Sequence, residues 1–325
     1  MMRSLSGIQP SGILHIGNYF GAIKQFIDLQ DEYEGFYFLA DFHALTSLPD
    51  SESLKHNTMS AILDYLACGL DPEKSTLFLQ SDVPEHTELS WILSNVTPIG
   101  LLERGHSYKD KVSKGIKPNT GLFTYPVLMA ADILIYDSDI VPVGKDQKQH
   151  LEMTRDIAIK FNEHYNKEVF KLPEEKILET LAVVPGTDGE KMSKSYKNII
   201  NMFLPEKELK KQVMSIVTDS TPLEEPKNPD NNITKLYSLF ASKEEIQAMK
   251  DNFTNGNYGY GHGKTELYNK ILEYFAPYRK KREELENNMD YVEKILKKGA
   301  EKARDIASKK VSEVRKTVGL MGRNY

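Results

Sequence analysis

Residues 7–22 read Gly-Ile-Gln-Pro-Ser-Gly-Ile-Leu-His-Ile-Gly-Asn-Tyr-Phe-Gly-Ala. The apolar residues up to Ile8 favour a strand, the following glycines, proline and serine favour a turn, and the residues from Ala22 to Gln30 favour a helix. A strand, a glycine-rich turn and a helix together point backbone N–H groups and a helix dipole at an anion. His15 and Asn18 add side-chain donors at the same place. An ordinary turn between a strand and a helix is the simpler interpretation of this stretch alone.

The next 130 residues repeat the alternation of strands and helices. Phe36–Asp41 is a continuous apolar run typical of a buried parallel strand, Ser51–Leu70 is an amphipathic helix, and Ser75–Gln80 and Asp139–Gly144 are further strands. We therefore expect an α/β fold, a parallel sheet with helices on its faces. Ligands of such sheets bind at the carboxyl ends of the strands, and His43 lies just past the end of the second one.

The composition of the 325-residue chain is that of a globular protein of about two domains, with 40% hydrophobic and 27% charged residues. No apolar run is long enough to cross a membrane. The single cysteine, Cys68, excludes an internal disulfide framework and fits a reducing compartment. We expect a cytoplasmic protein without a membrane partner.

After Asn198 the pattern changes to charged helical segments separated by joints rich in proline or glycine. We expect helices at Glu206–Val217, Ser242–Asp251, Thr265–Leu285 and Met289–Thr317. The predicted domains are therefore residues 1–197 and an all-helical domain of residues 198–325. The net charge is −5, yet residues 276–325 hold fourteen Lys and Arg against eight Asp and Glu. Such a tail can hold a phosphate backbone, or it can be a solvated helical face.

Asp132 interrupts an otherwise apolar helical run, Thr124–Tyr136. A lone carboxylate there costs free energy unless a donor reaches it. The carboxylate could cap a neighbouring backbone or pair with a distant lysine. Alternatively the donor is missing because a ligand brings it, and an indole N–H is such a donor. Met129 lies on the same helical face, where its thioether can lie against an aromatic ring.

Residues 191–195 read Lys-Met-Ser-Lys-Ser. Two lysines three residues apart can bracket a polyphosphate whose charge grows during a reaction. Together with Pro10-Ser-Gly-x-x-x-Ile-Gly-Asn18, this stretch resembles the paired nucleotide-binding motifs of class I aminoacyl-tRNA synthetases, and those of the bacterial-type tryptophanyl-tRNA synthetases in particular. The resemblance covers essentially the whole chain.

The resemblance implies a Rossmann-like nucleotide-binding domain with a helical insertion at about residues 84–137, which carries the contact of a homodimer. The helical domain would read the tRNA anticodon, and its last helix would be able to pack on the first domain. The phosphates of ATP would meet Lys111, Lys191 and Lys194 as catalytic residues, and Mg²⁺ would be bound through the ATP oxygens. Other ATP contacts implied by the resemblance are Gln9, Pro10, Ser11, His15, Gly17, Asn18, Gly144, Lys145, Asp146, Val184, Met192, Ser193 and Ser195. The implied tryptophan-binding residues are His43, Tyr125, Met129, Asp132, Val143 and Gln147.

The implied reaction joins L-tryptophan to tRNA(Trp) through a tryptophanyl-adenylate. A tyrosyl-tRNA synthetase of the same subclass is the main alternative. A nucleotidyltransferase without RNA would keep both ATP motifs but would not need the basic tail. A non-enzymatic RNA-binding relative should lack Asp132 or the two lysines of residues 191–195, and both features are present.

Overall fold

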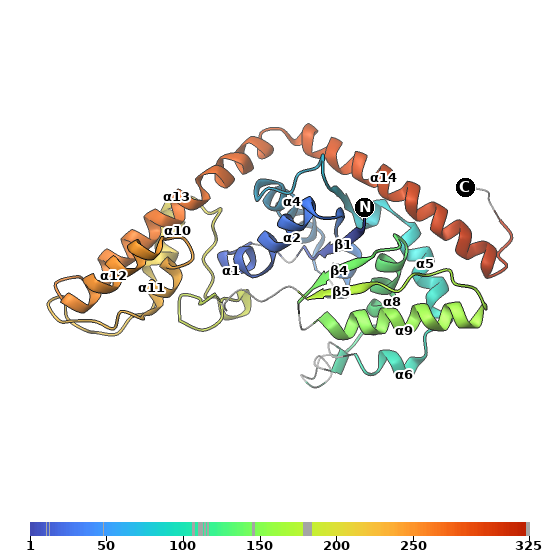
Figure 1. The fold of residues 1–325 in the computed structure, drawn as a ribbon, viewed down its shortest axis with the longest axis horizontal. Helices are drawn as coiled ribbons and strands as arrows, with labels where there is room; N and C mark the ends of the chain where they lie inside the picture. Colours follow the sequence, from blue (N-terminus) through green and yellow to red (C-terminus); the bar gives the residue numbers. More distant parts are fainter. Residues whose placement is uncertain are drawn as a thin grey trace. The chain divides into compact units, whose positions relative to one another are not determined.

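The computed structural model describes residues 1–10, 12, 14–47, 49–105, 108–109, 113, 115, 117–144, 147–177 and 184–322. It contains a five-stranded sheet in the order β3-β2-β1-β4-β5. Strands β1, β4 and β5 of this sheet are labelled in Figure 1. Every pair of neighbouring strands is parallel. The strands are β1 (Arg3–Ile8), β2 (Glu34–Leu39), β3 (Thr76–Leu79), β4 (Ile140–Val143) and β5 (Glu174–Ile177). The predicted α/β class is confirmed.

The chain divides into two compact units. The first unit comprises Met1–Gly12, Phe26–Glu179 and Asn288–Tyr325, and the second comprises Ile13–Gln25 and Thr180–Asn287. The domain boundary predicted between residues 197 and 198 stays a prediction. Helices of the first unit include α3 (Asp41–Ala44), α4 (Ser51–Ala67), α5 (Glu85–Ser94), α6 (Ile99–Leu102), α8 (Thr120–Leu134), α9 (Lys148–His164) and α14 (Met289–Thr317). Those of the second unit include α1 (Ile16–Asn18), α10 (Glu206–Met214), α11 (Asn232–Tyr237), α12 (Lys243–Asn255) and α13 (Tyr260–Glu286).

The helix expected from Ala22 to Gln30 is present, but it is not a regular α-helix throughout. The chain forms a π-helix at Tyr19–Ile23, then α2 (Lys24–Asp28) and a 3₁₀ helix at Leu29–Asp31. The Tyr19 hydroxyl lies 3.0 Å from that of Tyr278, and the Tyr19 ring packs edge-on against Phe275. These contacts within the second unit bury Tyr19 almost completely. Packing with a distant helix therefore accompanies a local departure from α-helical geometry.

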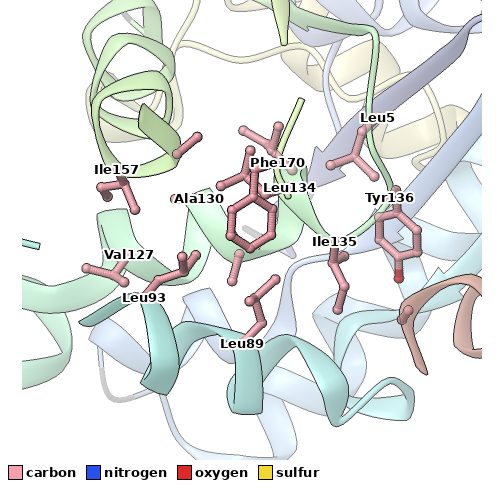
Figure 2. Packing of buried hydrophobic residues seen from close by; sticks show 14 of the residues in the cluster. Leu5, Leu89, Leu93, Val127, Ala130, Leu134, Ile135, Tyr136, Ile157 and Phe170 are labelled. Atoms are coloured by element: carbon pink, nitrogen blue, oxygen red, sulfur yellow. The ribbon is translucent and has the colours of Figure 1, made fainter. Parts of the chain in front are cut away.

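The core of the first unit lies between the sheet and helices α5, α8 and α9 (Figure 2). Leu89 and Leu93 of α5 face Val127, Ala130 and Leu134 in the same cluster, and all of these side chains are buried. Apolar positions recur on one face of each helix because that face meets the sheet or the neighbouring helix. The core holds α8 in place, and α8 carries Asp132. Among the described residues, no helix combines the length and apolar character needed to cross a bilayer.

Helix α14 lies along the edge strand β3 of the first unit. A Cβ atom on Gly299 would stand 1.9 Å from the Leu77 carbonyl oxygen, so only glycine permits this approach. Several basic side chains of α14 pair with acids of the same unit. These pairs are Lys298–Glu73, Lys302–Glu34, Arg304–Glu85, Lys310–Asp137 and Arg315–Glu88. These five basic side chains of the tail are thus paired with acids of their own unit.

Candidate active site

A cavity of about 400 Å³ opens in the first unit beside the carboxyl ends of β1, β2 and β4. A volume of this size is typical of small-molecule sites. All six residues predicted to bind tryptophan line it, together with Gln9 and Gly144 from the predicted ATP set. Most of the remaining wall is apolar, including Leu5, Phe38 and Ile133. The fold therefore brings together residues that the sequence separates by more than a hundred positions.

Asp132 stands at the wall of this cavity and is 1% exposed. Its Oδ1 atom accepts from Gln80 Nε2 at 2.8 Å and lies 2.6 Å from His86 Nδ1. Its Oδ2 atom lies 2.8 Å from Nε2 of His43, which also lines the cavity. The expectation that Asp132 lacks a partner in its own chain is therefore wrong. The donors come from distant elements that the sheet brings to one edge.

A carboxylate has about four acceptor positions, and the three contacts that the described residues make with Asp132 leave one unused. Since Oδ1 has two partners and Oδ2 has one, the remaining position belongs to Oδ2. Hydrogen bonds from His43 and His86 outweigh the effect of burial and lower the pKa of Asp132 below its usual value. The group is thus an anion at neutral pH and can only accept hydrogen bonds. It is suited to a ligand that brings an N–H or O–H donor.

The hydrogen bond from Gln80 to Asp132 costs free energy at the other end of the Gln80 amide. Its side chain is fully buried, and within the described part of the chain its Oε1 atom accepts no hydrogen bond. An unpaired buried amide oxygen costs about 1–3 kcal/mol. The contact with a carboxylate requires the amide nitrogen, so the oxygen must face the other way.

In the stretch of residues 7–22, the backbone at the start of α1 is held by contacts within the second unit. His15 Nδ1 accepts from the Asn18 N–H at 3.3 Å, and the Asn18 side-chain oxygen accepts from the His15 N–H at 3.3 Å. The N–H of Ile16 donates to the Ile200 carbonyl, and that of Gly17 to the Met192 sulfur. The N–H groups of Ile16, Gly17 and Asn18 thus have acceptors within the second unit.

His15 nevertheless keeps a ring nitrogen that can donate. Burial, with the nearby Lys194 charge as the second cause, lowers the pKa of His15 to about 4. The imidazole is therefore neutral at pH 7. Because Nδ1 accepts from a backbone N–H, the proton sits on Nε2, which makes Nε2 a hydrogen-bond donor. A donor of this kind can hydrogen-bond the oxygen of an anion.

The lysine-rich stretch is ordered around Asn198. The Asn198 side chain accepts from the Ser193 N–H at 2.7 Å and donates to the Lys191 carbonyl at 3.1 Å. Met192 is buried, and its N–H donates to the Val184 carbonyl at 2.9 Å. Lys191 and Ser195 are exposed, whereas Lys194 is half-buried at the start of a 3₁₀ turn. The anchoring of Met192 and Ser193 thus leaves Lys191 and Ser195 at the surface.

Of the predicted site residues, one described residue and four that lie outside the described residues remain. Pro10 lies two residues past the end of β1 and is buried. Ser11, Lys111, Lys145 and Asp146 lie outside the described residues, so their predicted roles stay predictions. Sequence reasoning missed Gln80, His86 and Asn198. The one signal that the sequence offered for His86 was a histidine next to the apolar residues of a predicted helical segment. Nothing in the sequence distinguishes Asn198 from other loop asparagines.

Comparisons with known proteins agree on one family. A family model described as class I tRNA synthetases (W and Y) matches residues 1–276. The tryptophan–tRNA ligase of Fusobacterium nucleatum subsp. nucleatum is 71% identical over 325 residues, which is the whole of both chains. That of Rhodopirellula baltica is 55% identical, covering 98% of this chain and 100% of the relative. The crystal structure of Campylobacter jejuni tryptophanyl-tRNA synthetase complexed with ADP and tryptophan is 53% identical, with a TM-score of 0.94 over 98% of this chain and 100% of that one.

Proposed function

This chain belongs to the class I tRNA synthetases of the tryptophan and tyrosine family, and we propose that it is a tryptophan–tRNA ligase. In the proposed first step, the tryptophan carboxylate attacks the α-phosphorus of ATP, forming tryptophanyl-adenylate and releasing pyrophosphate. In the second step, a 3′-terminal ribose hydroxyl of tRNA(Trp) takes the aminoacyl group and AMP leaves.

The first step needs positioning and charge neutralisation rather than a general base, because the attacking carboxylate is already ionised. We assign charge neutralisation on the phosphates to Lys191, Lys194 and Lys111, with neutral His15 as a hydrogen-bond donor. Mg²⁺ bound through the ATP phosphates would neutralise further charge there. In this proposal Gly144 and Asp146 meet the ATP ribose.

The observation that carries the proposal is the open acceptor position of Asp132 at the cavity wall. The residue is buried and ionised, and its three contacts within the described part of the chain leave one lone pair on Oδ2. An indole offers one polar atom, an N–H donor, and therefore matches that position. Met129 and the apolar wall around it would cover the indole ring.

Tyrosine is the alternative substrate, since a phenol O–H can also donate to Asp132. Amino-acid-dependent exchange of pyrophosphate into ATP separates the two possibilities when both amino acids are tested on the same enzyme. Exchange with tryptophan at least tenfold more efficient than with tyrosine is expected, followed by charging of tRNA(Trp). Exchange with tyrosine alone would reverse the assignment. Exchange with tryptophan but no charging of any tRNA would favour a nucleotidyltransferase.

We also propose that the chain is a homodimer. Leu45, Trp91 and Ile99 of the first unit are large apolar side chains with 47%, 73% and 66% of their surface exposed. Trp91 and Ile99 lie in the predicted insertion, where a second copy would cover them. Sedimentation should give twice the chain mass, and Trp91→Glu should shift it toward the monomer. A monomeric wild-type chain at micromolar concentration would refute this. A cytoplasmic location stays a prediction.

A further inference from the structure

The hydrogen bonds around Asp132 extend one residue deeper into the core. His86 Nδ1 lies 2.6 Å from Asp132 Oδ1, and His86 Nε2 lies 2.7 Å from the Tyr136 hydroxyl oxygen. Neither His86 nor Tyr136 is accessible to solvent. A chain of three side chains thus leads from the apolar cluster, where Tyr136 packs (Figure 2), to the wall of the cavity.

We propose that His86 and Tyr136 are positioning residues for recognition of the amino acid. They hold Oδ1 of Asp132 on the core side, so that the open lone pair of Oδ2 stays aimed into the cavity. This inference rests on the proposed function, because it assigns a role in binding the indole N–H.

The direction of each hydrogen bond follows from the chemistry of the groups. An ionised carboxylate only accepts, so His86 must donate through Nδ1. In a neutral imidazole the other nitrogen, Nε2, is then an acceptor, and the Tyr136 O–H supplies the donor. Burial raises the pKa of Tyr136 well above its usual value, so the phenol keeps its proton. Tyr136 therefore fixes the tautomer of His86 that Asp132 requires.

The surroundings leave the imidazole little freedom to turn. The rings of Phe38 and Phe78 lie 5.9 Å and 6.2 Å from the His86 ring, centroid to centroid. Both phenylalanines are buried, so an apolar wall flanks the histidine. Gln80 donates to the same oxygen, and two donors on Oδ1 resist rotation of the carboxylate more than one does. The neighbouring Oδ2 has a single partner in the chain, His43, among the described residues.

The test compares tryptophan with 3-benzothienylalanine, in which sulfur replaces the indole N–H. The ratio of their kcat/KM values in ATP–pyrophosphate exchange reports the N–H contact alone, because a general loss of stability affects both substrates equally. The variants are Tyr136→Phe, His86→Leu and His86→Asn. Asparagine keeps a donor near the position of Nδ1. Tyr258→Phe is the matched control, since it removes a tyrosine hydroxyl that donates to Glu266 at 2.7 Å in the second unit.

The wild-type enzyme should prefer tryptophan by about 10- to 100-fold. Tyr136→Phe should reduce that preference by about three- to tenfold, and His86→Leu should abolish most of it, whereas His86→Asn should retain most of it. Tyr258→Phe should leave the ratio unchanged. If His86→Leu fails to fold, Tyr136→Phe decides the matter. A ratio within twofold of wild type in Tyr136→Phe overturns the inference while leaving the proposed function intact. Absence of any tryptophan-dependent exchange in the wild type overturns both.

Discussion

Replacing Asp132 by asparagine should separate recognition of the ligand from folding. The amide oxygen can take the place of Oδ1 and accept from Gln80 and His86, which are both fully buried. The amide nitrogen then takes the place of Oδ2 and faces His43. The His43 side chain is 15% exposed and can relieve the conflict by adopting its other tautomer. We therefore expect Asp132→Asn to fold, with a loss of about 1–3 kcal/mol in the free energy of unfolding.

The substitution should also weaken the binding of tryptophan, and the loss should be a larger fraction of the binding free energy than of the free energy of unfolding. A hydrogen bond to a charged acceptor contributes about 1.5–3 kcal/mol, and each 1.4 kcal/mol is a factor of ten. The indole N–H would meet an N–H donor in the variant, so the dissociation constant for tryptophan should rise by about 10- to 150-fold. Phenylalanine has no such hydrogen, so its affinity should hardly change. Asp132→Ala would leave the donors of Gln80, His86 and His43 without their acceptor. A loss of tryptophan binding in that variant could not be separated from a loss of folding.

Titration calorimetry with tryptophan and phenylalanine, together with thermal midpoints, provides the measurement. Asp64→Asn is the control, because Asp64 is a buried carboxylate of α4 that does not line the cavity. The control should change the thermal midpoint without changing tryptophan affinity. The reasoning fails if Asp132→Asn remains folded and binds tryptophan within twofold of the wild type.

Three further predictions concern other parts of the chain. His15 has a pKa of about 4 when folded and about 6.5 when unfolded, so between these values the unfolded chain binds an extra proton and stability falls as the pH falls. The thermal midpoint of wild type should therefore drop more between pH 7 and pH 5 than that of His15→Gln, and equal drops would contradict the burial argument. Lys194→Ala should slow adenylate formation by about 100-fold in single turnover with the tryptophan dissociation constant unchanged, and a large loss of tryptophan affinity would remove Lys194 from the phosphate role. Gly299→Ala should cost about 1–3 kcal/mol in urea unfolding, because its Cβ would press on the Leu77 carbonyl, whereas Gly261→Ala, with open space around it, should cost little.

Strands that are buried on both faces could be predicted from the sequence, and β5 could not. Phe36–Asp41 is a continuous apolar run, and the observed β2 lies within two residues of it. The edge strand β5 reads Glu-Glu-Lys-Ile and, among the described strands, pairs with β4 alone. Charged side chains are common on edge strands, where one side faces solvent, so their sequence does not differ from that of a loop.

The motifs could be found in the sequence, but the contacts that hold them could not. Lys191 and Lys194 stand out as a spaced pair of cations, whereas Asn198 is one loop asparagine among many. Its role follows from a turn that returns the chain to Ser193 and Lys191. In the same way, the N–H of Gly17 donates to the sulfur of Met192, 175 residues away. No pattern of local spacing reports such a contact.

Asp132 shows both the strength and the limit of reasoning from a buried charge. The rule that a buried carboxylate must be paired drew attention to this residue, but it led to the wrong conclusion that the chain supplies no donor. The donors lie 46, 52 and 89 residues away, on elements that meet only once the sheet has formed. Counting donors against the four acceptor positions of the carboxylate requires the structure. That count, rather than the isolation of the acid, is what leaves room for one hydrogen from a ligand.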